Sequence, residues 1–420
     1  MRTFAGTQRL PQADEARCRS CGSAPLEVFL QLGDLPLPDA LLRESQLAEP
    51  EPRYPLDLAF CPDCALVQIL ASVPPERLFV ENYLYFSSYS EDLLRHAREE
   101  ALALADELGL GPESLVVEAA SNDGYLLRNF VELGIPVLGI DPAPIQAEAA
   151  EAVGVPTLRE FFGSELARRL LAEGRCADAI VANNVLAHTP DPNDLLAGAA
   201  LLLADDGVVA VENTYVRDLI ENLAFDTVYH EHFSYLSCTS ITALAERNGL
   251  HLNGVEHFPG VQGGSLRWRL GKRKSPAPEV ERYLEEERER GLDRPDYYRR
   301  FGERVERACG ELLALLRKLK ATGASIAAYG AAAKGTVLLN HAGIDGSLID
   351  FVVDRNPHKQ GLFMPGVHLP IRDPSALLED RPDYLLLLAW NYRDEIMRQQ
   401  DEYRRDGGRF VVPLPEPDVV

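Results

Sequence analysis

The chain has 420 residues, of which 46% are hydrophobic and 25% charged, and its formal net charge is −23. This composition is typical of a globular protein of two or three domains. The negative charge argues against a nucleic-acid partner, because contacts to phosphates require a basic surface. It still permits an anionic small ligand, since one helix N-terminus or one lysine is enough to hold a phosphate.

The N-terminal segment Met1–Glu15 has no apolar core of the length found in signal peptides. The most apolar stretches, Leu196–Leu203 and Tyr384–Trp390, are too short to cross a bilayer. We therefore expect a cytoplasmic protein with no membrane partner, present as a monomer or a small homo-oligomer.

Three segments differ in character, and they predict three domains. Residues 1–75 are rich in proline and cysteine and show little periodicity, which is typical of a small metal-stabilised module. Residues 76–270 alternate short apolar runs with helical patterns, as in a doubly wound α/β domain. Residues 271–420 begin with two charged helical patterns, which we interpret as a solvated helix pair, and continue as a second α/β unit.

The first domain contains two CxxC pairs, Cys18/Cys21 and Cys61/Cys64. Two such knuckles deliver four thiolates to one tetrahedral Zn²⁺, whereas redox disulfides or unrelated buried thiols are the alternatives. Four thiolates leave no open coordination position, so the predicted zinc is structural and not catalytic.

The alternating pattern predicts the positions of strands and helices in the second and third domains. In the second domain, the pattern predicts strands at Leu115–Glu118, Val137–Ile140, Ala179–Ala182 and Val208–Val211, with helices at Ile145–Ala152 and Ser164–Ala172. In the third, it predicts helices at Val280–Gly291 and Tyr297–Thr322, followed by strands at Ser325–Tyr329, Ile349–Val353, Tyr384–Leu388 and Phe410–Val412.

The turn after the first of these strands indicates a cofactor site. Glu118 ends the strand, and the small residues of the turn allow a ligand to approach the backbone. Asp141, which follows the next strand, is suited to accept both hydroxyls of a ribose. The turn lacks GxGxxG and any phosphate-binding loop, which favours S-adenosylmethionine over NAD, although a generic Rossmann turn remains the alternative. The predicted cofactor-binding residues are Glu118, Ala120, Ser121, Asn122, Asp123, Gly124, Asp141, Asn183 and His188, the last of which is equally well read as an ordinary loop residue.

The segment Phe225–Tyr235 carries Tyr229, His230, Glu231, His232 and Tyr235 close together, after a strand end. Active sites of α/β proteins lie at such ends. The His-Glu-His spacing differs from the HExxH metal motif. The alternative for the tyrosines is aromatic packing at a domain boundary.

In the last domain, the turn after Ser325–Tyr329 leads into a helix and has the strand–turn–helix pattern that holds a phosphate on backbone N–H groups. Lys334 in this turn is placed to neutralise a diphosphate. The alternative is a ligand-free fold that only shapes the substrate cleft.

Seven motifs in order along the chain resemble those of S-adenosylmethionine-dependent sugar C-methyltransferases, which make branched deoxysugars on TDP-type carriers. The motifs are Cys61–Gln68, Tyr83–Ser88, Ser121–Tyr125, Tyr229–His232, Gly263–Arg267, Tyr329–Gly335 and Leu387–Asn391. The resemblance implies a four-cysteine zinc domain, a class I methyltransferase core and a C-terminal Rossmann-like domain, with a nucleotide-linked keto sugar as substrate.

The resemblance assigns catalytic roles to Tyr229, Glu231 and His232, with Tyr85 as a fourth member and Tyr83 as the less favoured tyrosine. The substrate-binding residues that we predict are Lys334, Gln262, Gly335 and Tyr83. Three residues depart from the pattern. Ala120 replaces a glycine but is still small, Gln262 replaces a common histidine in the loop expected to face the sugar, and Gly335–Val337 replaces Gly-Asn-Thr in the C-terminal loop.

Methyl transfer to carbon requires a carbanion-like nucleophile, which a 4-keto sugar provides once its C3 proton is removed. His232 is the favoured base because the ordinary pKa of histidine lies near physiological pH, and Glu231 either orients it or acts as the base itself. Tyr229 and Tyr85 are expected to stabilise the enolate oxygen. The alternatives are an O- or N-methyltransferase, an NAD-dependent nucleotide-sugar enzyme and a non-catalytic zinc scaffold.

Overall fold

The computed structural model describes residues 16–80 and 85–420. Its first sheet has four antiparallel strands in the order β1-β2-β3-β9. Their bounds are β1 Glu27–Pro36, β2 Arg53–Phe60, β3 Val67–Ile69 and β9 Ser234–Tyr235. The last strand comes from the middle of the chain, so the N-terminal sheet is completed by a distant segment. The sequence pattern did not predict these strands, because register shifts at Val28/Leu30 and Gln31/Asp34 break the alternation of β1.

The second sheet has seven strands in the order β10-β11-β8-β7-β4-β5-β6. Strands β4 to β8 are parallel, and β11 and β10 join as antiparallel strands at one edge. The bounds are β4 Val116–Ala119, β5 Val137–Ile140, β6 Thr157–Leu158, β7 Ala177–Asn183, β8 Leu203–Thr214, β10 His251–Phe258 and β11 Ser265–Gly271. All four strands predicted here are present; three match to within two residues at each end, whereas β8 begins five residues before the predicted Val208.

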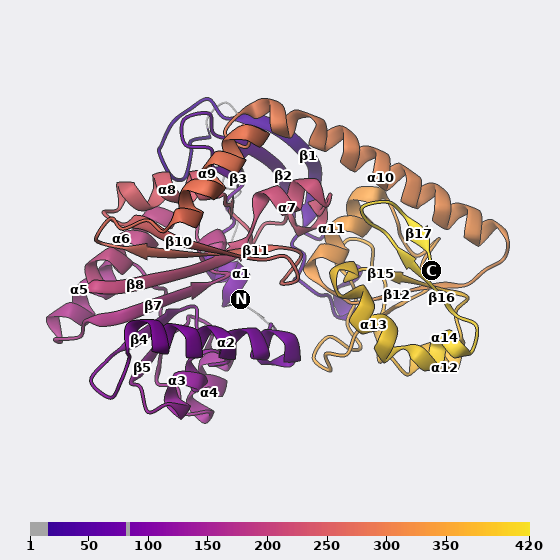
Figure 1. The fold of residues 1–420 in the computed structure, drawn as a ribbon. Coiled ribbons are helices and arrows are strands. Elements are labelled where there is room, and N and C mark those ends of the chain that lie inside the picture. The colour runs from indigo at the N-terminus through magenta and orange to yellow at the C-terminus, as the bar shows by residue number, and fades with distance from the viewer. Residues whose placement is uncertain (1–15, 81–84) are drawn as a thin grey trace.

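Helices cover both faces of this sheet because its strands are apolar on both sides. Val116 packs with the helices of one face, whereas Val117 and Ala119 pack with those of the other. The helices of the first face are α2 Glu91–Leu108, α3 Leu127–Glu132 and α4 Pro144–Ala152, and those of the second include α5 Ser164–Ala172, α6 Pro192–Leu202 and α8 Cys238–Arg247. Figure 1 shows α2, α3 and α4 together beneath the strands.

The C-terminal sheet has six strands in the order β14-β13-β12-β15-β16-β17, all parallel except β17. The strands are β12 Ile326–Tyr329, β13 Val352–Val353, β14 Ile371–Arg372, β15 Tyr384–Leu387, β16 Arg409–Val412 and β17 Asp418–Val419. The helices are α11 Ala333–Ala342, α12 Ala376–Asp380, α13 Arg393–Gln399 and α14 Asp401–Arg405. The third α/β unit was therefore predicted correctly, apart from the short strands β14 and β17.

Two helices, α9 Pro278–Arg290 and α10 Pro295–Ala321, connect the second domain to the third. Figure 1 shows α10 running along the top of the molecule from the N-terminal strands to the C-terminal domain. The predicted helix pair is present and much of its surface is exposed, but α10 also buries an apolar stripe that includes Tyr298, Phe301 and Leu312. The Tyr298 ring stacks on Phe60 of β2 at a centroid distance of 4.9 Å.

One carboxylate fixes α9 to the methyltransferase sheet. Glu287 is fully buried and accepts hydrogen bonds from the Cys238 and Thr239 backbone N–H groups at 2.7 and 2.8 Å, at the start of α8. It also accepts from the Tyr215 hydroxyl at 2.9 Å. A carboxylate at a helix N-terminus satisfies its free N–H groups and is favoured by the helix dipole.

We expect Glu287→Ala to lower the free energy of unfolding by about 3–5 kcal/mol, because its buried donors lose their acceptor. Urea denaturation followed by circular dichroism measures this change. The control is Glu289→Ala on the exposed side of the same helix, which should change the unfolding free energy by no more than about 0.5 kcal/mol. Equal effects of the two substitutions would contradict the assignment.

Candidate functional site: a zinc centre and a three-domain cavity

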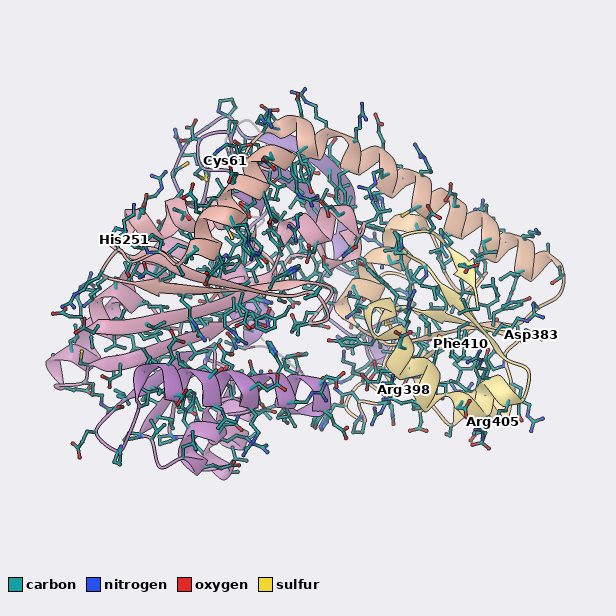
Figure 2. All side chains as sticks on the ribbon, in the orientation of Figure 1. Cys61, His251, Asp383, Arg398, Arg405 and Phe410 are labelled. Carbon is teal, nitrogen blue, oxygen red and sulfur yellow. The ribbon has the colours of Figure 1, made fainter. Side chains whose placement is uncertain are left out.

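The four predicted cysteines come together in the N-terminal domain, where Figure 2 labels Cys61. Their sulfur atoms all lie within 4.8 Å of one another, with 3.5 Å between Cys18 and Cys64 and 3.5 Å between Cys21 and Cys61. Four thiolates around Zn²⁺ at about 2.3 Å stand about 3.8 Å apart, so the set fits a tetrahedral zinc ion.

The two knuckles have the same backbone geometry. The Gly22 N–H donates to the Cys18 carbonyl at 2.9 Å, and the Ala65 N–H donates to the Cys61 carbonyl at 2.9 Å. Both residues are left-handed, with φ of +75° and +57°. The metal site is therefore preformed by two matching turns, one of which uses alanine where glycine is usual.

The cofactor loop follows β4 and has the predicted form. Ala120 and Asn122 have positive φ angles of 52° and 49°, which turn the backbone sharply after the strand. Asp141 follows β5 and accepts from the Asn122 and Ala143 N–H groups, each at 2.8 Å. A Cβ added to Gly139 would lie 2.5 Å from the Ser121 hydroxyl, so only glycine fits beneath the loop. These residues fit the adenosyl part of S-adenosylmethionine.

A cavity of about 640 Å³ opens from this loop and is lined by all three domains. Eleven of the predicted site residues line it, namely Tyr85, Ala120, Asn122, Asp141, Asn183, His188, Tyr229, Glu231, His232, Gln262 and Lys334. The structure thus brings together residues from the cofactor loop, the Tyr229–His232 segment and the start of α11.

Five predicted residues lie beside the cavity and not in its lining. Ser121, Asp123 and Gly124 belong to the far side of the cofactor turn, and Asp123 accepts from the Ser88 N–H at 3.1 Å. Glu118 is buried beneath the turn, where burial and nearby acidic groups raise its pKa well above the ordinary value. Gly335 lies in α11 and packs against Leu388. Tyr83 lies outside the described residues.

His232 is held in a buried, aromatic setting. Its Nδ1 lies 2.8 Å from the Thr227 carbonyl oxygen, so Nδ1 carries the proton and Nε2 has the free lone pair. The Tyr229 ring lies against it at a centroid distance of 3.9 Å. Burial lowers the pKa of His232 to about 4, and the nearby Lys334 acts in the same direction. The imidazole is therefore neutral at physiological pH.

His188 and Glu231 stand beside this imidazole in the lining. The His188 ring meets His232 edge to face at 4.6 Å, and burial keeps its pKa well below the ordinary value. Burial raises the pKa of Glu231 well above its ordinary value; nearby Asp39 adds to this effect and Lys359 opposes it. The protonated form of Glu231 is therefore more favoured than in a solvent-exposed carboxyl group.

Lys334 enters the cavity from the C-terminal domain. Its Nζ donates to the Asn391 side chain at 2.9 Å and lies 4.9 Å from the centre of the Trp390 ring. The Trp390 indole donates to Asp226 at 2.7 Å, so this contact joins the C-terminal domain to the segment that carries His232. Burial lowers the pKa of Lys334, and the Asp226 carboxylate opposes that shift.

Sequence reasoning missed several lining residues, including Asp39 from the N-terminal domain, Asn213 from the end of β8 and Lys359 from the C-terminal domain. The position of Asn213 at a strand end was a usable signal. Asp39 and Lys359 lie in loops and carry no motif that would have identified them.

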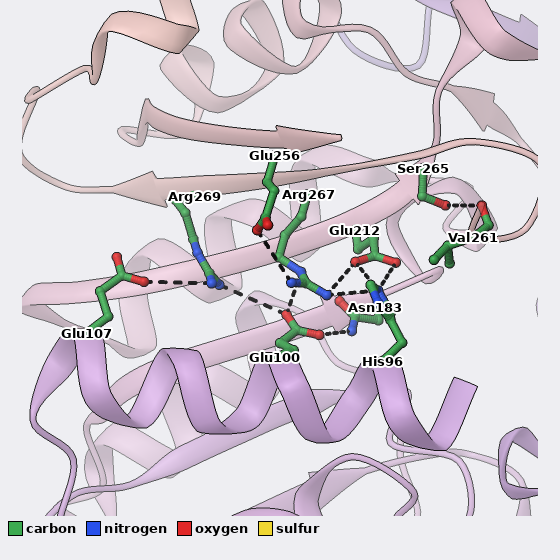
Figure 3. Close-up of polar contacts among 10 residues, drawn as sticks. All are labelled: His96, Glu100, Glu107, Asn183, Glu212, Glu256, Val261, Ser265, Arg267 and Arg269. Carbon is green, nitrogen blue, oxygen red and sulfur yellow. Dashed lines mark hydrogen bonds and ion pairs between the residues drawn. The ribbon is translucent and has the colours of Figure 1, made fainter. Parts of the chain in front are cut away.

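A buried ion cluster lies behind the lining (Figure 3). Arg267 of β11 pairs with Glu100 of α2 at 3.0 Å and with Glu212 of β8 at 2.7 Å. Glu100 accepts a hydrogen bond from the Asn183 side chain, while His96 lies 2.9 Å from Glu212. The cluster fixes α2 to the sheet and orients Asn183 at the edge of the cavity.

Comparisons with known proteins agree with this architecture. Three family models match in order: a zinc binding domain at residues 18–79, a methyltransferase domain at 89–253 and a C-methyltransferase C-terminal domain at 260–415. The C-methyltransferase NovU of Streptomyces niveus is 36% identical over 406 residues, which cover 96% of each chain. The chain belongs to this C-methyltransferase family. It is an S-adenosylmethionine-dependent enzyme. Its N-terminal domain contains a four-cysteine zinc site.

Two solved methyltransferase structures each resemble less than half of this C-methyltransferase. A possible histamine N-methyltransferase from Thermotoga maritima is 18% identical and covers 43% of this chain and 91% of its own, with a TM-score of 0.33. Magnesium protoporphyrin IX methyltransferase from Synechocystis PCC 6803 is 15% identical. The match covers 47% of this chain and 89% of that enzyme, with a TM-score of 0.33. These likenesses carry no argument about the substrate. In the described part of the chain, no helix is long and apolar enough to cross a membrane.

We expect Cys61→Ser to abolish stoichiometric zinc binding and to lower the unfolding free energy by about 3 kcal/mol or more, because structural zinc contributes directly to folding. Elemental analysis and thermal denaturation with and without a chelator measure both effects. Cys176→Ser, at an exposed and isolated cysteine, is the matched control and should retain zinc. Full zinc content in Cys61→Ser would contradict the site.

Proposed function

We propose that this C-methyltransferase methylates C3 of a nucleotide-linked 4-keto deoxysugar, with TDP as the expected carrier. The observation that carries the proposal is the single cavity in which Asp141, His232 and Lys334 meet, each from a different part of the fold. The cavity therefore brings a cofactor-loop acid, the proposed base and a cationic side chain into one lining.

His232 is the proposed base. Its free Nε2 lone pair takes the C3 proton, and the electron pair of the broken C–H bond moves onto the C4 carbonyl oxygen. Burial keeps the imidazole neutral and ready to accept that proton. When bound, S-adenosylmethionine would supply the methyl group: the enolate would form the new C3–methyl bond as the sulfonium–methyl bond breaks, which restores the C4 carbonyl and leaves S-adenosylhomocysteine. The proton on His232 then leaves to solvent.

We assign stabilisation of the enolate oxygen to Glu231, Tyr229 and Tyr85. Glu231 is assigned as a hydrogen-bond donor because burial raises the pKa of its carboxyl group well above the ordinary value, which favours the protonated form. Tyr229 and Tyr85 line the same cavity and provide hydroxyl donors. Tyr85 is tied to the cofactor loop because its carbonyl accepts from the Asn122 side chain at 3.2 Å.

The carrier diphosphate is assigned to the start of α11. Ala332, Ala333 and Lys334 line the cavity there, where the free N–H groups and the dipole of the helix favour an anion. Lys359 lines the same region. Gln262 lies in the β10–β11 turn, and we assign it to the sugar. The roles of Gln262 and Gly335 remain predictions. The oligomeric state and a cytoplasmic location also remain predictions.

The alternatives raised by the sequence lose their support. A non-catalytic scaffold and an NAD enzyme do not fit membership of a methyltransferase family, and the C-methyltransferase relative argues against O- or N-methylation.

The direct test is incubation of the enzyme with labelled S-adenosylmethionine and a panel of TDP-linked and UDP-linked 4-keto and 4-hydroxy sugars. Mass spectrometry should show a gain of one methyl group on a 4-keto substrate only, and NMR should place it on C3. Methylation of a 4-hydroxy sugar on oxygen would contradict the proposal.

His232→Asn should abolish methyl transfer and also the exchange of the C3 proton with D₂O, while the affinity for S-adenosylmethionine stays within about twofold. NMR of the substrate and calorimetry measure these quantities. His251→Asn, on β10 away from the cavity lining, is the control and should retain both activities. Continued exchange in His232→Asn would assign the base elsewhere.

The pH dependence follows from the lowered pKa of His232. Because the base must be unprotonated, kcat/KM should fall only as the pH drops towards about 4, and not near the ordinary histidine value of about 6.5. Initial rates between pH 5 and pH 8, with unfolding monitored in parallel, test this. An acidic limb centred near pH 6.5 in folded enzyme would contradict a desolvated base.

A further inference from the structure

Arg19 lies inside the first zinc knuckle, between Cys18 and Cys21, yet its side chain reaches out of the zinc site. Its Nη1 donates to the Pro190 carbonyl at 3.0 Å. Its Nη2 donates to the Ala71 carbonyl at 3.0 Å and to the Ser72 hydroxyl at 2.8 Å. One guanidinium therefore joins the N-terminal domain to the loop that follows His188.

The same guanidinium also contacts the segment that carries His232. It lies over the Phe233 ring at 4.9 Å from the centroid, within the range of a cation–π contact. The Phe233 N–H donates to the Ala187 carbonyl at 2.7 Å. Arg19 thus touches Phe233, which follows His232, and Pro190, two residues beyond His188.

The knuckle itself is fixed in place, so the guanidinium has a rigid base. The Arg19 N–H donates to the Gln68 side chain at 2.8 Å. The Asn193 side chain of α6 donates to the Arg19 and Ser20 carbonyls at 2.8 and 3.0 Å. Zinc ligation by the two flanking cysteines holds the intervening backbone in its turn.

We propose that Arg19 is a positioning residue that couples the zinc knuckle to methyl transfer by holding the His188 and His232 segments together. The kinetic part of this proposal rests on the proposed function, whereas the structural part does not. A zinc ion that completes four-thiolate coordination takes no part in the chemistry, but through Arg19 it fixes the edge-to-face contact of the two imidazoles at 4.6 Å.

Arginine is suited to this role because its planar, five-donor fork reaches several carbonyls and an aromatic face at the same time. Lysine has a compact charge on a flexible stem and is expected to replace only one of these contacts. Arg19→Lys should therefore have an intermediate effect, and Arg19→Met should lose the polar contacts while keeping an apolar stem.

The first experiment needs no substrate. Hydrogen–deuterium exchange with mass spectrometry on the full-length zinc-loaded enzyme should show faster exchange in Arg19→Met for peptides spanning residues 186–193 and 229–236. The peptide that contains the cofactor loop, residues 118–125, should be unchanged, and zinc content should stay at one per chain. Arg17→Met is the matched control, because the Arg17 side chain is exposed and donates to the Gly22 carbonyl of its own knuckle.

The second experiment measures kinetics on the sugar identified by the panel. Arg19→Met should lower kcat by about 100-fold, as expected when catalytic groups are displaced, while the Kd for S-adenosylmethionine stays within about twofold. The acidic limb of the pH profile should also move upwards from about 4 towards the ordinary histidine value, because a loosened His232 gains water.

Unchanged exchange at residues 186–193 and 229–236 in Arg19→Met would overturn the proposal, whatever the substrate proves to be. A loss of kcat matched by equal losses of zinc and of cofactor affinity would overturn it as well, since that pattern indicates general unfolding. Faster exchange together with a shifted pH profile at full zinc content supports it. If no panel sugar is methylated, the proposed function fails while the exchange result still decides the structural coupling.

Discussion

Desolvation of the segment from Thr227 to Tyr235 is the constraint on which the active site depends. His232 must remain neutral among aromatic rings, and the hydrogen bond from its Nδ1 to the Thr227 carbonyl fixes which nitrogen carries the proton. Water in this segment would return the imidazole and Glu231 to their ordinary protonation states. Two domains exclude it: the N-terminal sheet pairs with β9, and Trp390 of the C-terminal domain bonds to Asp226.

The cofactor side of the cavity has a different electrostatic arrangement. Glu100 and Glu212 are almost fully buried, and both pair with Arg267, which is 4% exposed. Burial nonetheless raises the pKa of Glu100, against the attraction of Arg267. Breaking such a cluster leaves an uncompensated charge in the interior, so its members are expected to tolerate substitution poorly. The cluster holds α2 in place, and the neighbouring Ser87 donates its N–H to Asn122 of the cofactor loop at 2.9 Å.

Much of the fold and part of the site followed from local sequence. The CxxC spacing identified the zinc ligands, and the apolar runs located the parallel strands, because both signals lie within a few residues. The pairing of β9 with β3 could not be predicted, since β9 has two residues and its register depends on a surface formed far away in the chain. Asp39 and Lys359 enter the cavity only through the packing of three domains. Burial that favours unprotonated His232 and protonated Glu231 is likewise a property of the tertiary structure.

The position of β9 late in the chain affects folding during synthesis. During synthesis the N-terminal domain emerges early, but the partner of β3 follows only at Ser234–Tyr235. Until then Val67 and Ile69, which are fully buried in the finished protein, belong to an open strand edge. Open apolar edges recruit other chains, and pairings between distant segments form slowly. The N-terminal sheet therefore stays one strand short until the chain has been made as far as Ser234–Tyr235.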